Sequence, residues 1–240
     1  MIMTNNEVIK QAMEYRRNML NLCDNEPIQD TFKLAEKAGF FIIATPLGNE
    51  FNNNYEYGFY KKIGSSKFIF INSTAYKATQ NFTIWHEVYH SLFPFNKFEM
   101  DYERDEEQAN IFSSNILIPT ESLKLELSKN IINKKLYANE IHKVSLKYKM
   151  TYKAVLKHFF DIVPELKTHL GYLYSKSNER KYLTVSQRDE LDELYEYGNK
   201  YLTKSIFEAI EDNHNKGIID DDDLSRINAI IGEVFSIDSK

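Results

Sequence analysis

The sequence predicts an α+β fold, in which a small β-sheet precedes a mostly helical body. Two runs of β-branched and aromatic residues, over 40–46 and 66–72, are typical of strands. From about residue 74 onward the apolar residues recur at helical spacing almost without interruption. The composition, with 42% hydrophobic and 27% charged residues and a net charge of −5, is ordinary for a globular protein. Strands followed by a run of helices predict the α+β class.

The first 72 residues contain the predicted sheet and two helices. Helical spacing covers 6–22 and 27–38, with Pro27 near a helix start and Gly39 just beyond a helix end. A third strand is predicted over 57–62, before the turn-like residues 64–66. Cys23 has no second cysteine to pair with, so an internal disulfide is excluded, and its apolar neighbours predict a packed thiol.

A buried helix is predicted over 82–93, because this segment is apolar around most of its circumference. Asn81 or Thr83 can cap its start, and Pro94 ends it. The helix contains the pentapeptide His-Glu-Val-Tyr-His at 86–90. Two histidines four residues apart project from one helix face, so both rings can reach one metal ion.

This pentapeptide has the geometry of a zinc hydrolase. Zinc binds neutral imidazole, and a catalytic zinc keeps one position open beside three protein ligands. Glu87 is placed to take a proton from the water that attacks a polarised carbonyl. The alternative is a buried helix whose two histidines, His86 and His90, are hydrogen-bonded within the core.

The third ligand is expected in the acidic helix predicted over 101–112. Glu106 shares the inward stripe of that helix with Ala109 and Asn110, whereas Glu107 lies on another side. Glu103, one turn before Glu106, is the main competitor as ligand. An acidic helix start favoured by the helix dipole would explain most of these charges without a metal.

Several motifs together resemble the ImmA/IrrE family of zinc metallopeptidases. They are the pair Phe82-Thr83 before the pentapeptide, the pattern Glu106-x-x-Ala109-Asn110 after it, and a segment that ends at Pro119. The segments 27–43 and 67–72 are similar to the opening helix and strands of that family, so the resemblance covers roughly residues 25–160. Trp85 departs from the family, since a small residue is usual there, and we expect it to narrow the substrate cleft.

The resemblance implies a zincin-like metallopeptidase domain. Carried over by position, His86, His90 and Glu106 would be the Zn²⁺ ligands and Glu87 the catalytic base. Members of the family typically inactivate a DNA-binding repressor that is often encoded beside them in a mobile element or stress-response locus. The implied substrate is therefore a protein, a helix-turn-helix transcriptional repressor, and the implied role is transcription regulation by repressor cleavage.

A helical hairpin is predicted over 137–160 within a locally basic segment. Residues 121–164 contain nine lysines and four acidic residues, and the two helices with their short break resemble a helix-turn-helix. Against DNA binding, the turn has no glycine and no arginine is present to read guanine edges. We favour a packed hairpin with lysines on its solvent-exposed face, in which His142 and His158 are surface or packing residues.

Residues 164–240 are expected to form a helical extension of the metallopeptidase domain at 1–163. Helical spacing runs from 191 to 210 and again from 224 to 235. A calcium loop over 212–223 is disfavoured, since His214 and Lys216 stand where oxygen ligands are needed. The aspartates at 220–223 more simply cap the last helix.

The composition also sets an expected location. No apolar run approaches the length of a membrane span, and the first residues lack the layout of a signal peptide, so a cytoplasmic location is expected. A second class of function stays open alongside the peptidase. The chain could be a non-hydrolytic regulator that binds a repressor or DNA and carries a structural or vestigial metal site.

Overall fold

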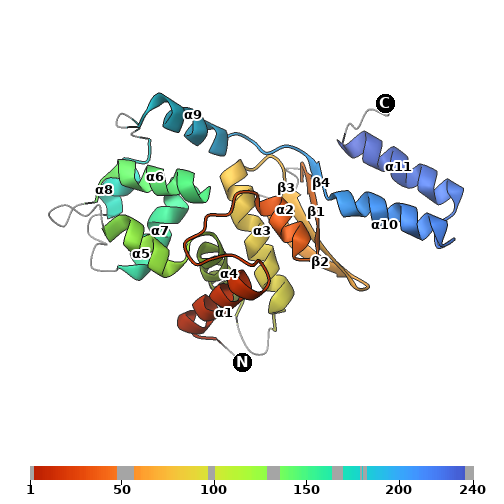
Figure 1. Ribbon diagram of the computed structural model, residues 1–240, viewed down its shortest axis with the longest axis horizontal. Helices are drawn as coiled ribbons and strands as arrows, with labels where there is room; N and C mark the ends of the chain where they lie inside the picture. Colours follow the sequence, from red (N-terminus) through yellow and green to blue (C-terminus); the bar gives the residue numbers. More distant parts are fainter. Residues whose placement is uncertain are drawn as a thin grey trace.

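The α+β class predicted from the sequence is the class observed. The computed structural model describes residues 3–47, 57–96, 101–128, 136–163, 170–178, 180 and 183–235, and their arrangement is shown in Figure 1. The elements in chain order are α1 (Asn5–Asn18), α2 (Thr31–Lys37), β1 (Phe40–Thr45), β2 (Gly58–Ile63), β3 (Ser66–Asn72), α3 (Lys77–Leu92), α4 (Tyr102–Leu117), α5 (Thr120–Ser128), α6 (Ala138–Tyr148), α7 (Tyr152–Ile162), α8 (Leu170–Ser175), α9 (Val185–Leu194), β4 (Tyr201–Leu202), α10 (Lys204–Asn215) and α11 (Asp221–Phe235).

The sheet has the strand order β2-β3-β1-β4 in the described residues. Strand β1 runs parallel to β3 and antiparallel to β4, while β2 and β3 form an antiparallel hairpin. Gly64, with φ of +58°, occupies the hairpin turn, where a side chain would be strained. Alternate residues of β1 point to the core, so that Phe40, Ile42 and Ala44 are buried. Strand β2 is an edge strand that borders α3.

Helix α3 lies between the sheet and α4. It packs against β2 and β3 on one side and against α4 on the other, and α4 is in turn covered by α1. Helix α1 forms because Thr4 and Glu7 make a reciprocal capping box at its start. Its residues Val8, Ala12 and Tyr15 are spaced along one face and are buried. The pentapeptide at 86–90 is thus held in the middle of the domain.

Helix α3 begins earlier than the sequence predicts. It starts at Lys77 rather than near residue 82, and Tyr76 precedes it without a side-chain cap. The prediction that Asn81 or Thr83 caps this helix is wrong, because both lie inside it. Thr83 donates a hydrogen bond to the carbonyl of Thr79, and Asn81 donates to the carbonyl of Lys149. The sequence predicts that the helix ends at residue 93, and its last residue in the structure is Leu92.

Cys23 is exposed, so the predicted packed thiol is wrong. The loop after α1 is instead anchored through its backbone. The buried guanidinium of Arg16 donates to the carbonyl oxygens of Cys23 and Glu26, and also to that of Ile116 in α4. With the backbone fixed by these bonds and Leu20 filling the core, the thiol points outward.

The hairpin α6–α7 is packed among α5, α8 and α9. Lys149 ends α6 in the left-handed region, with φ of 52°, a position where glycine is usual. Thr151 then caps α7 by accepting a hydrogen bond from the backbone N–H of Ala154. His142 and His158 are both buried, as packing residues of the hairpin.

The predicted continuous helix over 191–210 is wrong. Helix α9 ends at Leu194, and Tyr201 and Leu202 form β4 against β1 before α10 begins. The connection passes so close to α3 that a side chain at Gly198 would collide with Gln80. Thr203 then accepts from the backbone N–H of Ile42 at 2.6 Å and donates to its carbonyl at 3.1 Å. Strand pairing and these bonds outweigh the helical spacing of the sequence.

Helices α10 and α11 pack on each other and extend from the edge of the sheet (Figure 1). Neither has a buried residue. The aspartates cap α11 as predicted, since Asp220 accepts from the backbone N–H of Asp223. Lys216 pairs with Asp212, and His214 pairs with Asp221.

Candidate metal centre

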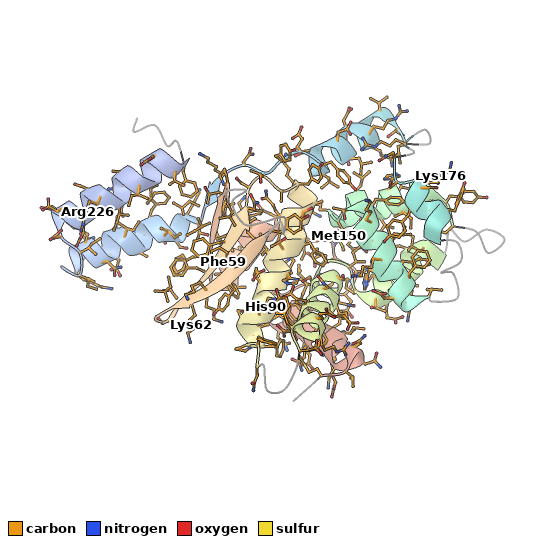
Figure 2. The ribbon with its side chains drawn as sticks, turned by 180° about the vertical axis from the view of Figure 1, so that it is seen from behind. Phe59, Lys62, His90, Met150, Lys176 and Arg226 are labelled. Carbon is orange, nitrogen blue, oxygen red and sulfur yellow. The ribbon has the colours of Figure 1, made fainter. Side chains whose placement is uncertain are left out.

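Three of the residues predicted as ligands come together where α3 meets α4. His86 and His90 project from α3 and Glu106 from α4, and one ligand atom of each lies within 4.8 Å of the others. Figure 2 shows His90 on α3, beside α4. Among the described residues, no other group of three His, Cys, Asp or Glu side chains is spaced for a metal.

The spacing of these three donors fits one zinc ion. The Nε2 atoms of His86 and His90 are 3.1 Å apart. Oε2 of Glu106 lies 3.2 Å from Nε2 of His86, and Oε1 of Glu106 lies 3.3 Å from Nε2 of His90. Ligands at zinc distances in a tetrahedral arrangement are separated by about 3.3 Å. Two imidazoles and one carboxylate are also a donor set that zinc accepts, and it leaves one position free.

Two other glutamates of α4 lie outside the cluster. Glu103 is exposed, and Glu107 is exposed and paired with Arg104. In the structure, Glu106 is the one of these three glutamates whose carboxylate lies beside the rings of His86 and His90.

Glu87 lies on α3 beside this cluster, and it is buried. The backbone N–H of Tyr60, on the edge strand β2, donates a hydrogen bond to its carboxylate. Burial raises the pKa of Glu87, and this effect outweighs the opposing influence of His86 and His90. A carboxylate with a raised pKa is a stronger base than one in water, as general-base chemistry near neutral pH requires.

The charges of the cluster favour a bound cation. Hydrogen bonds from His86 and His90 hold the pKa of Glu106 far below its usual range, so that this carboxylate is ionised. Burial alone would lower the pKa of His90, but its hydrogen bond to Glu106 and the nearby carboxylates raise it. Glu87, Asp105 and Glu106 together surround the two imidazoles with acidic groups.

Two further residues of α4 contact the histidine rings. Oδ1 of Asn110 lies 3.3 Å from Nδ1 of His86, and Oδ2 of Asp105 lies 3.2 Å from Nδ1 of His90. The sequence contained a signal for Asp105, which stands four and seven residues before the buried Ala109 and Phe112. No sequence signal pointed to Tyr60, because strand pairing and helix packing bring it to Glu87.

Trp85 does not narrow a cleft, contrary to the expectation from the sequence. Its side chain is fully buried in the core, together with Ile84 and Val88 of the same helix. The side of α3 that carries Trp85 therefore faces away from the open side of the metal cluster, and the large residue there fills the domain interior.

A groove of about 690 Å³ lies among α1, α4 and α7, and its lining includes none of His86, Glu87, His90 and Glu106. Its lining includes Phe82 and Asn110, two of the residues that neighbour the His86 ring. Most of the remaining lining comes from α1, α4 and α7, and it is rich in asparagine, serine and threonine side chains. Grooves of this volume are typical of ligand sites, and such side chains can both donate to and accept from a peptide backbone.

Comparison with family models decides where the chain belongs. Residues 35–159 match the model of the IrrE N-terminal-like domain, Peptidase M78, over more than half of the sequence. The chain belongs to the M78 peptidase family. Its fold is that of an M78 domain with additional C-terminal helices, and members of the family are metallopeptidases of the IrrE/ImmA type. No curated protein matched the chain. None of the described helices of this M78 protein is both long and apolar enough for a membrane span.

Proposed function

We propose that this M78 protein is a zinc endopeptidase in which His86, His90 and Glu106 hold the ion and Glu87 is the general base. The observation that carries the proposal is the mutual spacing of the three donors, 3.1 to 3.3 Å, next to a buried carboxylate. A zinc ion held there would supply Lewis acidity, which polarises a peptide carbonyl and makes water more acidic.

Glu87 would perform the proton transfers. Its carboxylate takes a proton from the attacking water as the water oxygen bonds to the carbonyl carbon. It then gives this proton to the amide nitrogen as the C–N bond breaks, so that an amine and a carboxylic acid form, and the acid releases its remaining proton to water. The Tyr60 N–H orients the Glu87 side chain, and burial keeps bulk water from competing for the proton.

The proposed substrate is a helix-turn-helix repressor in the cytoplasm, cleaved to relieve transcriptional repression. The family membership supports a protein substrate. The motifs shared with the ImmA/IrrE family support a repressor encoded close by, for example in a mobile element.

Direct DNA binding by the α6–α7 hairpin is a weaker candidate. Lys147 is paired with Glu126, and Lys149 donates to the carbonyl of Gln29, so two of its lysines are engaged within the chain. Helix α7 would be the recognition helix, but most of its length is buried against neighbouring helices. Its exposed side carries Asp161 along with Lys153 and Lys157, and an acidic residue is unfavourable against DNA phosphates.

The test compares the wild type with Glu87→Gln and with the matched control Glu103→Gln, which makes the same change at an exposed site on α4. Each protein is loaded with zinc, its metal content is measured, and it is incubated with the repressor encoded beside it. Fragments are identified by mass spectrometry. We expect equal zinc in all three proteins, with cleavage by the wild type and Glu103→Gln and at least a 100-fold slower reaction for Glu87→Gln.

A different result would favour the second class of function. If Glu87→Gln relieved repression as well as the wild type, the peptidase mechanism would be abandoned in favour of a non-hydrolytic regulator. Binding to DNA that weakens steeply with salt, and that is lost when Lys147, Lys149 and Lys153 become alanine, would favour the DNA alternative.

A further inference from the structure

Asp105 is a buried carboxylate that contacts the imidazole ring of His90. Its side chain is 1% exposed, and Oδ2 lies 3.2 Å from Nδ1 of His90. Within the described residues neither oxygen has a hydrogen bond of good geometry, so the close approach to His90 is its main compensation. Burying a carboxylate with so little compensation is costly, so its presence beside a metal cluster calls for a reason.

The ring of His90 is held at both nitrogens. Nε2 faces inward, 3.1 Å from Nε2 of His86 and 3.3 Å from Glu106. Nδ1 faces outward to Asp105. An N–H at Nδ1 that donates to the carboxylate leaves the lone pair at Nε2, which is the tautomer that a metal requires.

His86 has the same arrangement with a different partner. Its Nδ1 meets the amide oxygen of Asn110 at 3.3 Å, while its Nε2 faces Glu106. Helix α4 therefore provides the inner carboxylate and both outer partners, from positions 105, 106 and 110. The two histidines differ in one respect, because His90 is supported by a carboxylate and His86 by a neutral amide.

We propose that Asp105 is a positioning residue for the metal centre, which holds His90 in its metal-binding tautomer and strengthens Nε2 as a donor. The inference rests on the proposed function, in which His90 is a zinc ligand. A carboxylate behind a zinc-bound histidine fixes the ring orientation and raises the basicity of the ligand, and loss of such a partner typically weakens metal binding about 10- to 100-fold.

Helix-dipole stabilisation is the other explanation for an acidic residue at this place. Asp105 and Glu103 both belong to the first turn of α4 and would both favour its positive end. Glu103 is exposed and can do so at little cost, whereas Asp105 is buried. The two explanations differ in their effect on zinc, because only a partner of His90 changes the affinity of the site.

The experiment measures zinc binding itself. The wild type, Asp105→Asn, Asp105→Ala and the matched control Glu103→Gln are stripped of metal, and the zinc dissociation constant of each is determined by competition with a chromophoric chelator. The visible absorption spectrum of each cobalt-substituted protein is recorded, and circular dichroism establishes that the metal-free variants are folded. Asp105→Asn preserves size and shape, so it keeps the test decisive if Asp105→Ala unfolds.

We expect dissociation constants about 10- to 100-fold higher for Asp105→Ala, and an increase of several-fold for Asp105→Asn, together with shifted cobalt bands. Glu103→Gln should stay within twofold of the wild type. The inference is overturned if the folded Asp105 variants bind zinc within twofold of the wild type and have unchanged cobalt spectra. A wild type that binds zinc but cleaves nothing would instead contradict the proposed function and leave the role of Asp105 standing.

Discussion

His86 and His90 face each other with their Nε2 atoms 3.1 Å apart, while the Nδ1 atom of each ring is in contact with a side chain of α4. This pairing places the two Nε2 donor atoms at a spacing that one metal ion can bridge. A preassembled cluster of this kind should bind zinc in the folded state and have little affinity in the unfolded chain, so zinc should stabilise the protein.

We expect zinc at 100 times its dissociation constant to raise the free energy of unfolding by about 2.7 kcal/mol. His86→Ala and Glu106→Ala should each remove most of this gain, because each deletes one of three donors. Thermal or denaturant unfolding with and without zinc measures the gain in the free energy of unfolding. Glu107→Gln is the control, since Glu107 is exposed and paired with Arg104. An equal gain in all variants would show that zinc acts elsewhere.

His158 should make the fold sensitive to acid. It is buried, and its Nε2–H donates to the carbonyl of Ile118 at 2.9 Å. Burial lowers the pKa of His158 to about 4, from about 6.5 in the unfolded chain. The folded state therefore binds fewer protons than the unfolded state between these values. The contribution of His158 to the free energy of unfolding is fully present above pH 6.5. It is lost as the pH falls towards 4, and the total loss is about 3 kcal/mol.

The variant His158→Gln isolates this effect, because a glutamine amide can donate to the same carbonyl but does not titrate. Urea unfolding between pH 7 and pH 4 should show a smaller loss of stability for the variant than for the wild type. Parallel pH profiles for the two proteins would refute the assignment to His158.

Gly58 should be intolerant of any side chain. It begins β2, where a Cβ atom would lie 2.5 Å from the carbonyl oxygen of Phe70 and 2.8 Å from Cγ2 of Thr83. Since the first of these atoms is backbone, Gly58→Ala must push β2 away from β3 or α3. We expect a loss of about 1–3 kcal/mol in unfolding free energy. Peptidase activity should fall as well, because β2 carries the Tyr60 N–H that orients Glu87.

The control is Gly232→Ala in α11, where a Cβ would meet nothing within 4 Å. This change should be neutral or stabilise α11 by up to about 1 kcal/mol, since alanine favours helices. Equal effects of the two substitutions in denaturant titrations would contradict the packing argument for Gly58.

Thr203 should tie the C-terminal helices to the sheet. Its hydroxyl accepts from the backbone N–H of Ile42 and donates to the Ile42 carbonyl, and the side chain is fully buried. Thr203→Val keeps the shape and removes both bonds, which leaves a buried N–H without this acceptor. We expect a loss of about 1–3 kcal/mol. Proteolysis of the connection between α9 and α10 should become faster, whereas the exposed control Ser225→Ala should behave like the wild type.

Much of the site could be predicted from the sequence because its key spacings are local. Two histidines four residues apart share a helix face whatever surrounds the helix, and Glu106 shares a stripe with Ala109 and Asn110 for the same reason. The strands at 40–46 and 66–72 were predictable because each is a run of β-branched and aromatic residues, which favour strands. The competition among Glu103, Glu106 and Glu107 could not be decided from the pattern alone.

The tertiary structure decided what depends on contacts between distant segments. Helical spacing continues through Tyr201 and Leu202, yet pairing with β1 makes them a strand. The position of Glu106 beside both histidines follows from the packing of α4 on α3, and the burial of Asp105 behind His90 follows from the same packing. By itself the sequence determined the helix that carries His86, Glu87 and His90, because side-chain direction repeats every turn. Only the packing of α3, α4 and β2 determined which groups surround them, because close packing depends on the shapes of all the partners at once.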